Sequence, residues 1–201
     1  MKPLKTAGVS IIVGLAIGLL TGAYTAIKLA PFAEDLSSAN QILQSMTPLL
    51  TASTIIMIAV SIFTYIGFIT LGRKFKNKTL EITGWALMIL LIVQSINSLL
   101  MEPLSLTDTQ PSTASLIIIA LIGVGMLILG IGSIKLGKKV SLSKTAGILY
   151  IITGVSFVVY YLGIAMQTDM PILALVGGLV QFAALILASI LFFKASKKYE
   201  K

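Results

Sequence analysis

Six apolar stretches, each long enough to cross a lipid bilayer, occupy most of this 201-residue chain. A spanning helix takes about 20 apolar residues, because the hydrocarbon core is about 30 Å thick. Only 11% of the residues are charged, against roughly 25% in an ordinary soluble domain. The sequence therefore predicts an all-α protein, a six-span transmembrane helix bundle that forms a single domain over residues 1–201. The predicted spans are residues 6–29, 46–71, 80–100, 112–136, 145–166 and 171–193.

Basic residues gather on one side of the predicted membrane. Both termini and the breaks after the second and fourth spans together hold 14 of the 15 lysine and arginine residues, and only Lys28 falls on the other side. Cytoplasmic loops of membrane proteins carry the excess of lysine and arginine, so both termini are predicted to be cytoplasmic. The net charge of +8 then reflects topology and attraction to anionic inner-leaflet lipids. We expect no binding of nucleic acid.

Two segments allow a second interpretation. Lys2 and Lys5, the apolar run after them and the small residues at 21–23 also fit a secretory signal peptide. The packing pattern described below favours retention of this segment as the first span. Residues 31–45 carry apolar side chains at helical spacing, which predicts either a helix lying in the membrane interface or an early extension of the second span.

The chain contains similar segments 65 residues apart. Residues 67–74 read Gly-Phe-Ile-Thr-Leu-Gly-Arg-Lys, and residues 132–139 read Gly-Ser-Ile-Lys-Leu-Gly-Lys-Lys. Lys-Thr-Ala-Gly occurs at both 5–8 and 144–147. These matches predict three related helical hairpins with a pseudo-symmetry axis along the membrane normal. The alternative is that membrane helices flanked by lysine resemble each other through composition alone.

A stripe of small residues runs along the first span, at every fourth position. It consists of Ser10, Gly14, Gly18, Gly22 and Ala26. Membrane helices associate largely through close van der Waals contact, which small residues permit. The stripe therefore predicts a helix-packing face, used either inside the chain or between two copies of it.

Three uncharged polar side chains lie within the third and sixth spans, namely Gln94, Asn97 and Gln181. Formally charged residues are absent from the middle of every predicted span, whereas proton relays and ion pathways use such residues. The three polar side chains are expected either to form hydrogen bonds between helices or to line a pathway.

Cysteine and histidine are both missing from the chain. Their absence removes disulfides, thiolate and imidazole metal ligands, and the usual cysteine or histidine nucleophiles and bases. We therefore predict that the protein is not an enzyme and has no catalytic residue, cofactor or metal site.

Residues 132–196 contain the segments Ile-Lys-Leu-Gly-Lys-Lys, Lys-Thr-Ala-Gly-Ile-Leu-Tyr-Ile-Ile-Thr-Gly and Ile-Leu-Phe-Phe-Lys. This part, about a third of the chain, resembles small multi-span archaeal membrane proteins of unknown function. The resemblance implies a location in a prokaryotic plasma membrane. It implies no activity and no site residues.

Two functions fit these observations. The first is a non-enzymatic scaffold or accessory subunit, which would pack through its small residues against a membrane-protein partner or a second copy of itself. The second is a channel or facilitator for a small neutral or apolar solute, with Gln94, Asn97 and Gln181 along the route.

Overall fold

The computed structural model describes residues 2–32, 36–100, 113–137, 139–165 and 171–198. The long helices are α1 (Lys2–Leu29), α3 (Thr47–Lys74), α4 (Lys78–Leu100), α5 (Thr113–Lys135), α6 (Ser143–Ala165) and α7 (Pro171–Lys198). Two short helices, η1 (Ala30–Phe32) and α2 (Leu36–Ser45), connect α1 to α3. The described part of the chain contains no strand, and its six long helices are all apolar enough to cross a membrane. The predicted all-α, six-helix fold is confirmed.

The helices start and end somewhat differently from the predicted spans. α1 begins at Lys2 rather than at residue 6, and α7 continues to Lys198 rather than ending at residue 193. A helix satisfies its own backbone hydrogen bonds, and lysine stems reach toward the headgroups, so both helices can continue past their apolar segments. The predicted helix over residues 31–45 is shorter than expected. α2 begins at Leu36, and a turn at Met46 separates it from α3.

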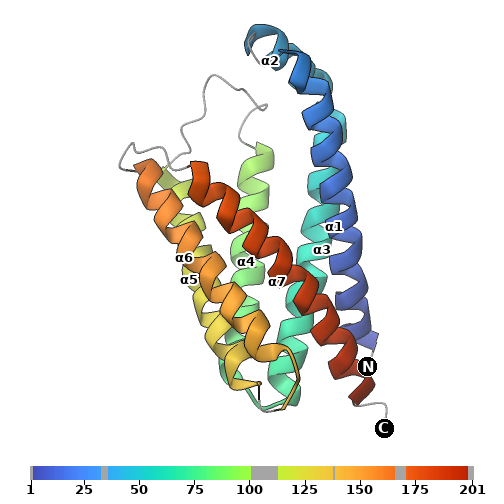
Figure 1. Ribbon diagram of the computed structural model, residues 1–201, viewed down its shortest axis with the longest axis vertical. Coiled ribbons are helices and arrows are strands. Elements are labelled where there is room, and N and C mark those ends of the chain that lie inside the picture. Colours follow the sequence, from blue (N-terminus) through green and yellow to red (C-terminus); the bar gives the residue numbers. More distant parts are fainter. Residues whose placement is uncertain (1, 33–35, 101–112, 138, 166–170, 199–201) are drawn as a thin grey trace.

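The six long helices form a closed ring. Each packs against the helices before and after it in the chain, and α7 also packs against α1. Figure 1 shows both termini at one end of the bundle, together with the α3–α4 and α5–α6 turns, and α2 at the other end. The end of the bundle that holds the two turns is called the basic end, because the lysines of both turns lie there. The opposite end is called the α2 end.

The tightly packed core occupies the half of the bundle nearest the basic end. In α1 the buried residues stop at Gly14, and in α3 they start at Thr64, so both helices are buried only toward the basic end. α1 and α7 meet near this end, where the Ser189 hydroxyl donates a hydrogen bond to the Gly8 carbonyl at 3.0 Å. The two helices then diverge toward the α2 end (Figure 1).

Glycines bring the backbones of α5 and α6 into direct contact. A Cβ atom added to Gly130 would lie 2.5 Å from the Gly147 carbonyl oxygen. One added to Gly154 would lie 2.6 Å from the Gly123 carbonyl oxygen. Gly123 and Gly130 of α5 are seven residues apart, and so are Gly147 and Gly154 of α6, so the two glycines of each helix lie on one face of it, as close helix packing in membranes requires.

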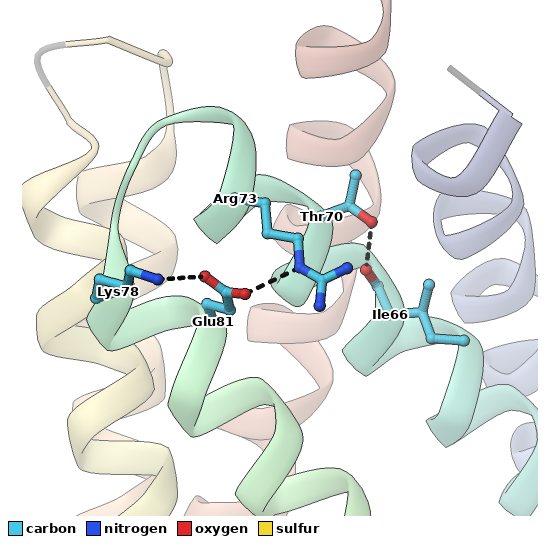
Figure 2. Close-up of polar contacts among 5 residues, drawn as sticks. All are labelled: Ile66, Thr70, Arg73, Lys78 and Glu81. Atoms are coloured by element: carbon cyan, nitrogen blue, oxygen red, sulfur yellow. Dashed lines mark hydrogen bonds and ion pairs between the residues drawn. The ribbon is translucent and has the colours of Figure 1, made fainter.

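The turn between α3 and α4 is held by an ion-pair cluster (Figure 2). Arg73 Nε lies 2.9 Å from Glu81 Oε1, and Lys78 Nζ lies 3.7 Å from Glu81 Oε2. Gly72 allows the two helices to approach, since a Cβ there would lie 2.5 Å from the Glu81 nitrogen. The Thr70 hydroxyl bonds the Ile66 carbonyl of its own helix at 2.7 Å and takes no part in the cluster.

Candidate functional site

A cavity of about 320 Å³ lies in the middle of the ring, and all six long helices contribute to its wall. The cavity residues of α1, α3, α5 and α7 lie near the middle of each helix, such as Leu15 of α1 and Val60 of α3, and those of α4 lie somewhat nearer the α2 end. The cavity therefore sits close to mid-depth in the membrane. Its wall is mostly apolar, with polar side chains from α3, α4, α6 and α7, which are Ser61, Thr64, Tyr65, Gln94, Tyr150, Tyr161 and Gln181.

Two polar atoms in the cavity wall have no hydrogen-bond partner among the described residues. They are the amide oxygen of Gln94 and the hydroxyl of Tyr150, both buried. By contrast, the Thr64 hydroxyl bonds the Val60 carbonyl at 2.8 Å, so its hydrogen-bonding capacity is used within its own helix. A buried polar group without a partner costs about 1–3 kcal/mol, so a molecule that reached either atom from the cavity would supply a hydrogen bond that the described chain does not.

The three polar residues singled out in the sequence separate into two groups. Gln94 of α4 and Gln181 of α7 both line the cavity, and the order of helices around the ring places them on opposite walls. Asn97 is absent from the wall. Its side-chain nitrogen donates to the Ser115 hydroxyl at 2.8 Å, which ties α4 to α5.

Cavity residues that the sequence did not single out include three aromatic residues of α6. Tyr150, Phe157 and Tyr161 all line the cavity. Their spacing of seven and then four residues places them on one face of the helix. That spacing is the signal that could have identified them.

An aromatic cluster closes the cavity toward the basic end. The Phe68 ring lies 5.5 Å from the Tyr150 ring and 5.0 Å from the Phe192 ring, in edge-to-face geometry. Phe68 follows the cavity residue Tyr65 by one helical turn in the direction of the basic end, and its side chain is 1% exposed. In this conformation the cavity does not continue to the basic end.

Of the three glycines in the small-residue stripe of α1, only Gly14, the one nearest the basic end, makes close contact with a neighbouring helix. A Cβ added to Gly14 would lie 2.6 Å from a Val60 methyl group, whereas Gly18 and Gly22 have no such neighbour within 4 Å. The Ser10 hydroxyl bonds the Thr6 carbonyl of its own helix at 2.8 Å, and Ala26 is exposed.

The open glycines lie above the cavity on the side of the α2 end. Gly18 follows Ile11 by seven residues, and Ile11 lines the cavity, so the two share a face of α1. In α7, Gly178 precedes the cavity residue Leu185 by the same interval and also has no neighbour within 4 Å of an added Cβ. Among the described residues, nothing therefore packs closely against Gly18 of α1 or Gly178 of α7, between the cavity and the α2 end.

Within the described residues, no group of three or more acidic side chains could hold a metal ion. Comparison of the chain with protein-family models, with curated protein sequences and with solved structures gave no match. The resemblance of residues 132–196 to archaeal membrane proteins therefore rests on the sequence segments alone.

Proposed function

We propose that this membrane protein binds a small neutral solute in the mid-membrane cavity and facilitates its passage across the bilayer. The observation that carries the proposal is that two residues lining the cavity, Gln94 and Tyr150, each have a buried polar atom, Oε1 and OH respectively, without a partner within the described chain. Small-molecule sites commonly combine an apolar wall with a few polar groups and measure about 300–1,000 Å³. The cavity, at about 320 Å³, falls at the lower end of that range.

The chemistry of the wall selects a neutral solute with hydrogen-bonding groups. Among the described residues, none that lines the cavity carries a formal charge, and placing a bare ion at mid-bilayer is costly. A purely apolar solute dissolves in lipid and crosses it unaided. The solute that gains most from amide and hydroxyl groups at mid-depth is therefore a small polyol or amide.

Passage of the solute across the membrane requires a second conformation, in which the cavity is open at the basic end. On the α2 side of the cavity, no described atom lies within 4 Å of a Cβ added to Gly18 or Gly178, while the cluster of Phe68, Tyr150 and Phe192 closes the basic end. Such a protein works as a gated facilitator, in which the aromatic rings move apart to release the solute, rather than as a permanently open pore.

The test is solute permeability of vesicles that contain the purified protein, measured with glycerol and urea by osmotic swelling. The protein is expected to raise the permeability to one of these solutes above that of protein-free vesicles. Gln94→Leu should lower the added permeability by roughly tenfold, the factor that corresponds to a lost hydrogen bond of about 1.4 kcal/mol.

Asn97→Leu is the matched control, because Asn97 lies on the same helix but bonds Ser115 outside the cavity. This variant should lose some stability and keep its solute permeability. Equal loss of permeability in the two variants, or no added permeability to either solute, would overturn the facilitator proposal.

A scaffold or accessory subunit is the second candidate. The observation in its favour is the open face at Gly18 and Gly22, which could receive a helix of a membrane partner or of a second copy. The Gly18→Leu variant described in the Discussion tests it. We infer no catalytic activity for either candidate.

We further propose that the protein lies in the plasma membrane with both termini in the cytoplasm, as the distribution of lysine and arginine supports. The chain has no cysteine, so single cysteines can be labelled without background. Lys76→Cys is expected to react only from the cytoplasmic side, and Ser105→Cys, outside the described residues, only from the other side. Labelling of both from the same side would contradict this topology.

A further inference from the structure

A second pocket, of about 310 Å³, lies at the basic end, away from the mid-membrane cavity. The α3–α4 turn and the start of α4 form one wall, and the end of α5 with the following turn forms the other. Its polar lining consists of Lys76, Asn77, Lys78, Thr79, Lys135 and Lys139. Four lysines from two separate turns thus face one hollow.

Hydrogen bonds between the two turns hold the pocket walls together. The Asn77 side-chain nitrogen donates to the Gly132 carbonyl at 2.8 Å, which links the start of α4 to α5. The Lys139 amino group donates to the Phe75 carbonyl at 3.4 Å, which links the two turns directly. The backbone of Lys76 adopts a left-handed conformation, with φ of 55°, as part of the tight turn. The pocket is therefore built into the fold and does not depend on a chance grouping of surface lysines.

The pocket is strongly electropositive. Glu81 is the one acidic residue in the part of the chain that the structure describes, and it lies against Arg73 and Lys78, as Figure 2 shows. Among the described residues, this single carboxylate is the only negative side chain to offset the charges of Arg73 and the four lysines of the pocket. The excess positive charge of Lys76 and Lys135 is suited to an anion with several acceptor oxygens, such as a phosphate group.

The depth of the pocket indicates where such a phosphate comes from. Lys78 begins α4 and Lys135 ends α5, so the pocket lies where two candidate membrane spans meet the polar headgroups. Phe75 and Leu136 form the apolar part of the wall beside the lysines. Basic pockets between membrane helices at this level bind the headgroups of anionic lipids.

We propose that the pocket formed by the α3–α4 turn and the end of α5 binds the phosphate group of an anionic phospholipid. The bound headgroup joins the two turns, so it stabilises the basic end of the bundle. This site is separate from the mid-membrane cavity, and the proposal does not depend on the facilitator function.

The experiment compares lipid binding by the full-length protein in detergent, measured by native mass spectrometry and by the shift in melting temperature. The probes are phosphatidylglycerol, phosphatidylcholine and inorganic phosphate. Phosphatidylglycerol should bind and raise the melting temperature, because a ligand that binds only the folded state stabilises it. Phosphatidylcholine, and inorganic phosphate at the same concentration, should have little effect.

The decisive variant is Lys76→Gln with Lys135→Gln, which removes two positive charges from the pocket. Its dissociation constant for phosphatidylglycerol should rise by about tenfold or more. Lys2→Gln with Lys197→Gln is the matched control, because it removes the same charge from the same end outside the pocket. The control should change the dissociation constant by less than about twofold. Lys76→Arg with Lys135→Arg should preserve binding and shows whether the loss follows from charge.

Several results would overturn the proposal. Equal weakening in the pocket and control variants would show that the lysines attract lipid only through overall charge. Equal binding of phosphatidylcholine would remove the anionic requirement. Binding of inorganic phosphate in place of phosphatidylglycerol would assign the pocket to a soluble anion.

Discussion

Replacing Gly130 with leucine is expected to disrupt the packing of α5 against α6 and to destabilise the whole bundle. Even a Cβ at this position would lie 2.5 Å from the Gly147 carbonyl oxygen, and a backbone atom cannot rotate away as a side chain can. Overpacking typically costs 1–3 kcal/mol, and we expect about 3 kcal/mol here. A loss of that size lowers the melting temperature by roughly 6–12 °C in a protein of this length.

Gly18→Leu is the matched comparison, because it places the same side chain on a glycine with no neighbour within 4 Å of an added Cβ. The melting temperature of this variant should stay close to that of the unchanged protein, with a change within about 0.5 kcal/mol. Equal destabilisation by Gly18→Leu and Gly130→Leu would contradict the packing described for α5 and α6.

Gly18→Leu also tests the scaffold candidate. If the open face of α1 receives a helix from a second copy or a membrane partner, the variant should abolish that assembly while the bundle stays folded. Leu19→Ile, which keeps a large apolar side chain, should leave the assembly intact. Loss of a stoichiometric complex only in Gly18→Leu would favour the scaffold over the facilitator.

The number and kind of the helices could be predicted from the sequence, because each spanning segment must satisfy its own backbone in lipid. The order of contacts around the ring could not, since it depends on which faces meet in three dimensions. The seven-residue spacing of Gly123 and Gly130 is typical of a packing face on a membrane helix. Only the structure shows that its partners are Gly154 and Gly147 of α6.

The candidate site was predictable only in part, as Gln94 and Asn97 illustrate. They lie three residues apart on α4 and have similar chemistry, so their roles cannot be distinguished from the sequence. Their roles differ because Ser115 of α5 lies beside Asn97, whereas Gln94 lines the cavity and its buried amide oxygen has no partner among the described residues. Which residue lies beside each amide depends on how α4 packs against the other helices, and the sequence alone does not give that packing.

The predicted internal repeat stays a prediction. Trp85 and Tyr150 occupy matching positions at the 65-residue offset, yet Trp85 is 43% exposed and Tyr150 is 2% exposed. Matching sequence positions therefore need not share an environment. The cavity draws on Tyr150 of α6 and on no tryptophan of α4, so its wall is not repeated from hairpin to hairpin.

Phe68→Ala is expected to have the second large effect, because Phe68 lies at the centre of the aromatic cluster that closes the cavity. Its ring packs between those of Tyr150 and Phe192 and is almost completely buried. Truncating a buried phenylalanine to alanine costs about 3–5 kcal/mol through lost contacts and the space left behind. Unfolding by denaturant in mixed micelles measures this loss.

Phe63→Ala provides the control on the same helix, because Phe63 is 43% exposed, on the outer surface of the bundle. It should change the stability by no more than about 0.5 kcal/mol.

The two variants are also expected to differ in their effect on the aromatic cluster that closes the cavity toward the basic end. With the Phe68 ring removed, the cavity gains a route toward the basic end, so glycerol or urea permeability of vesicles should rise at equal amounts of folded protein. Phe63→Ala should leave permeability unchanged, and unchanged permeability in Phe68→Ala would show that the aromatic cluster packs the core without closing a solute pathway.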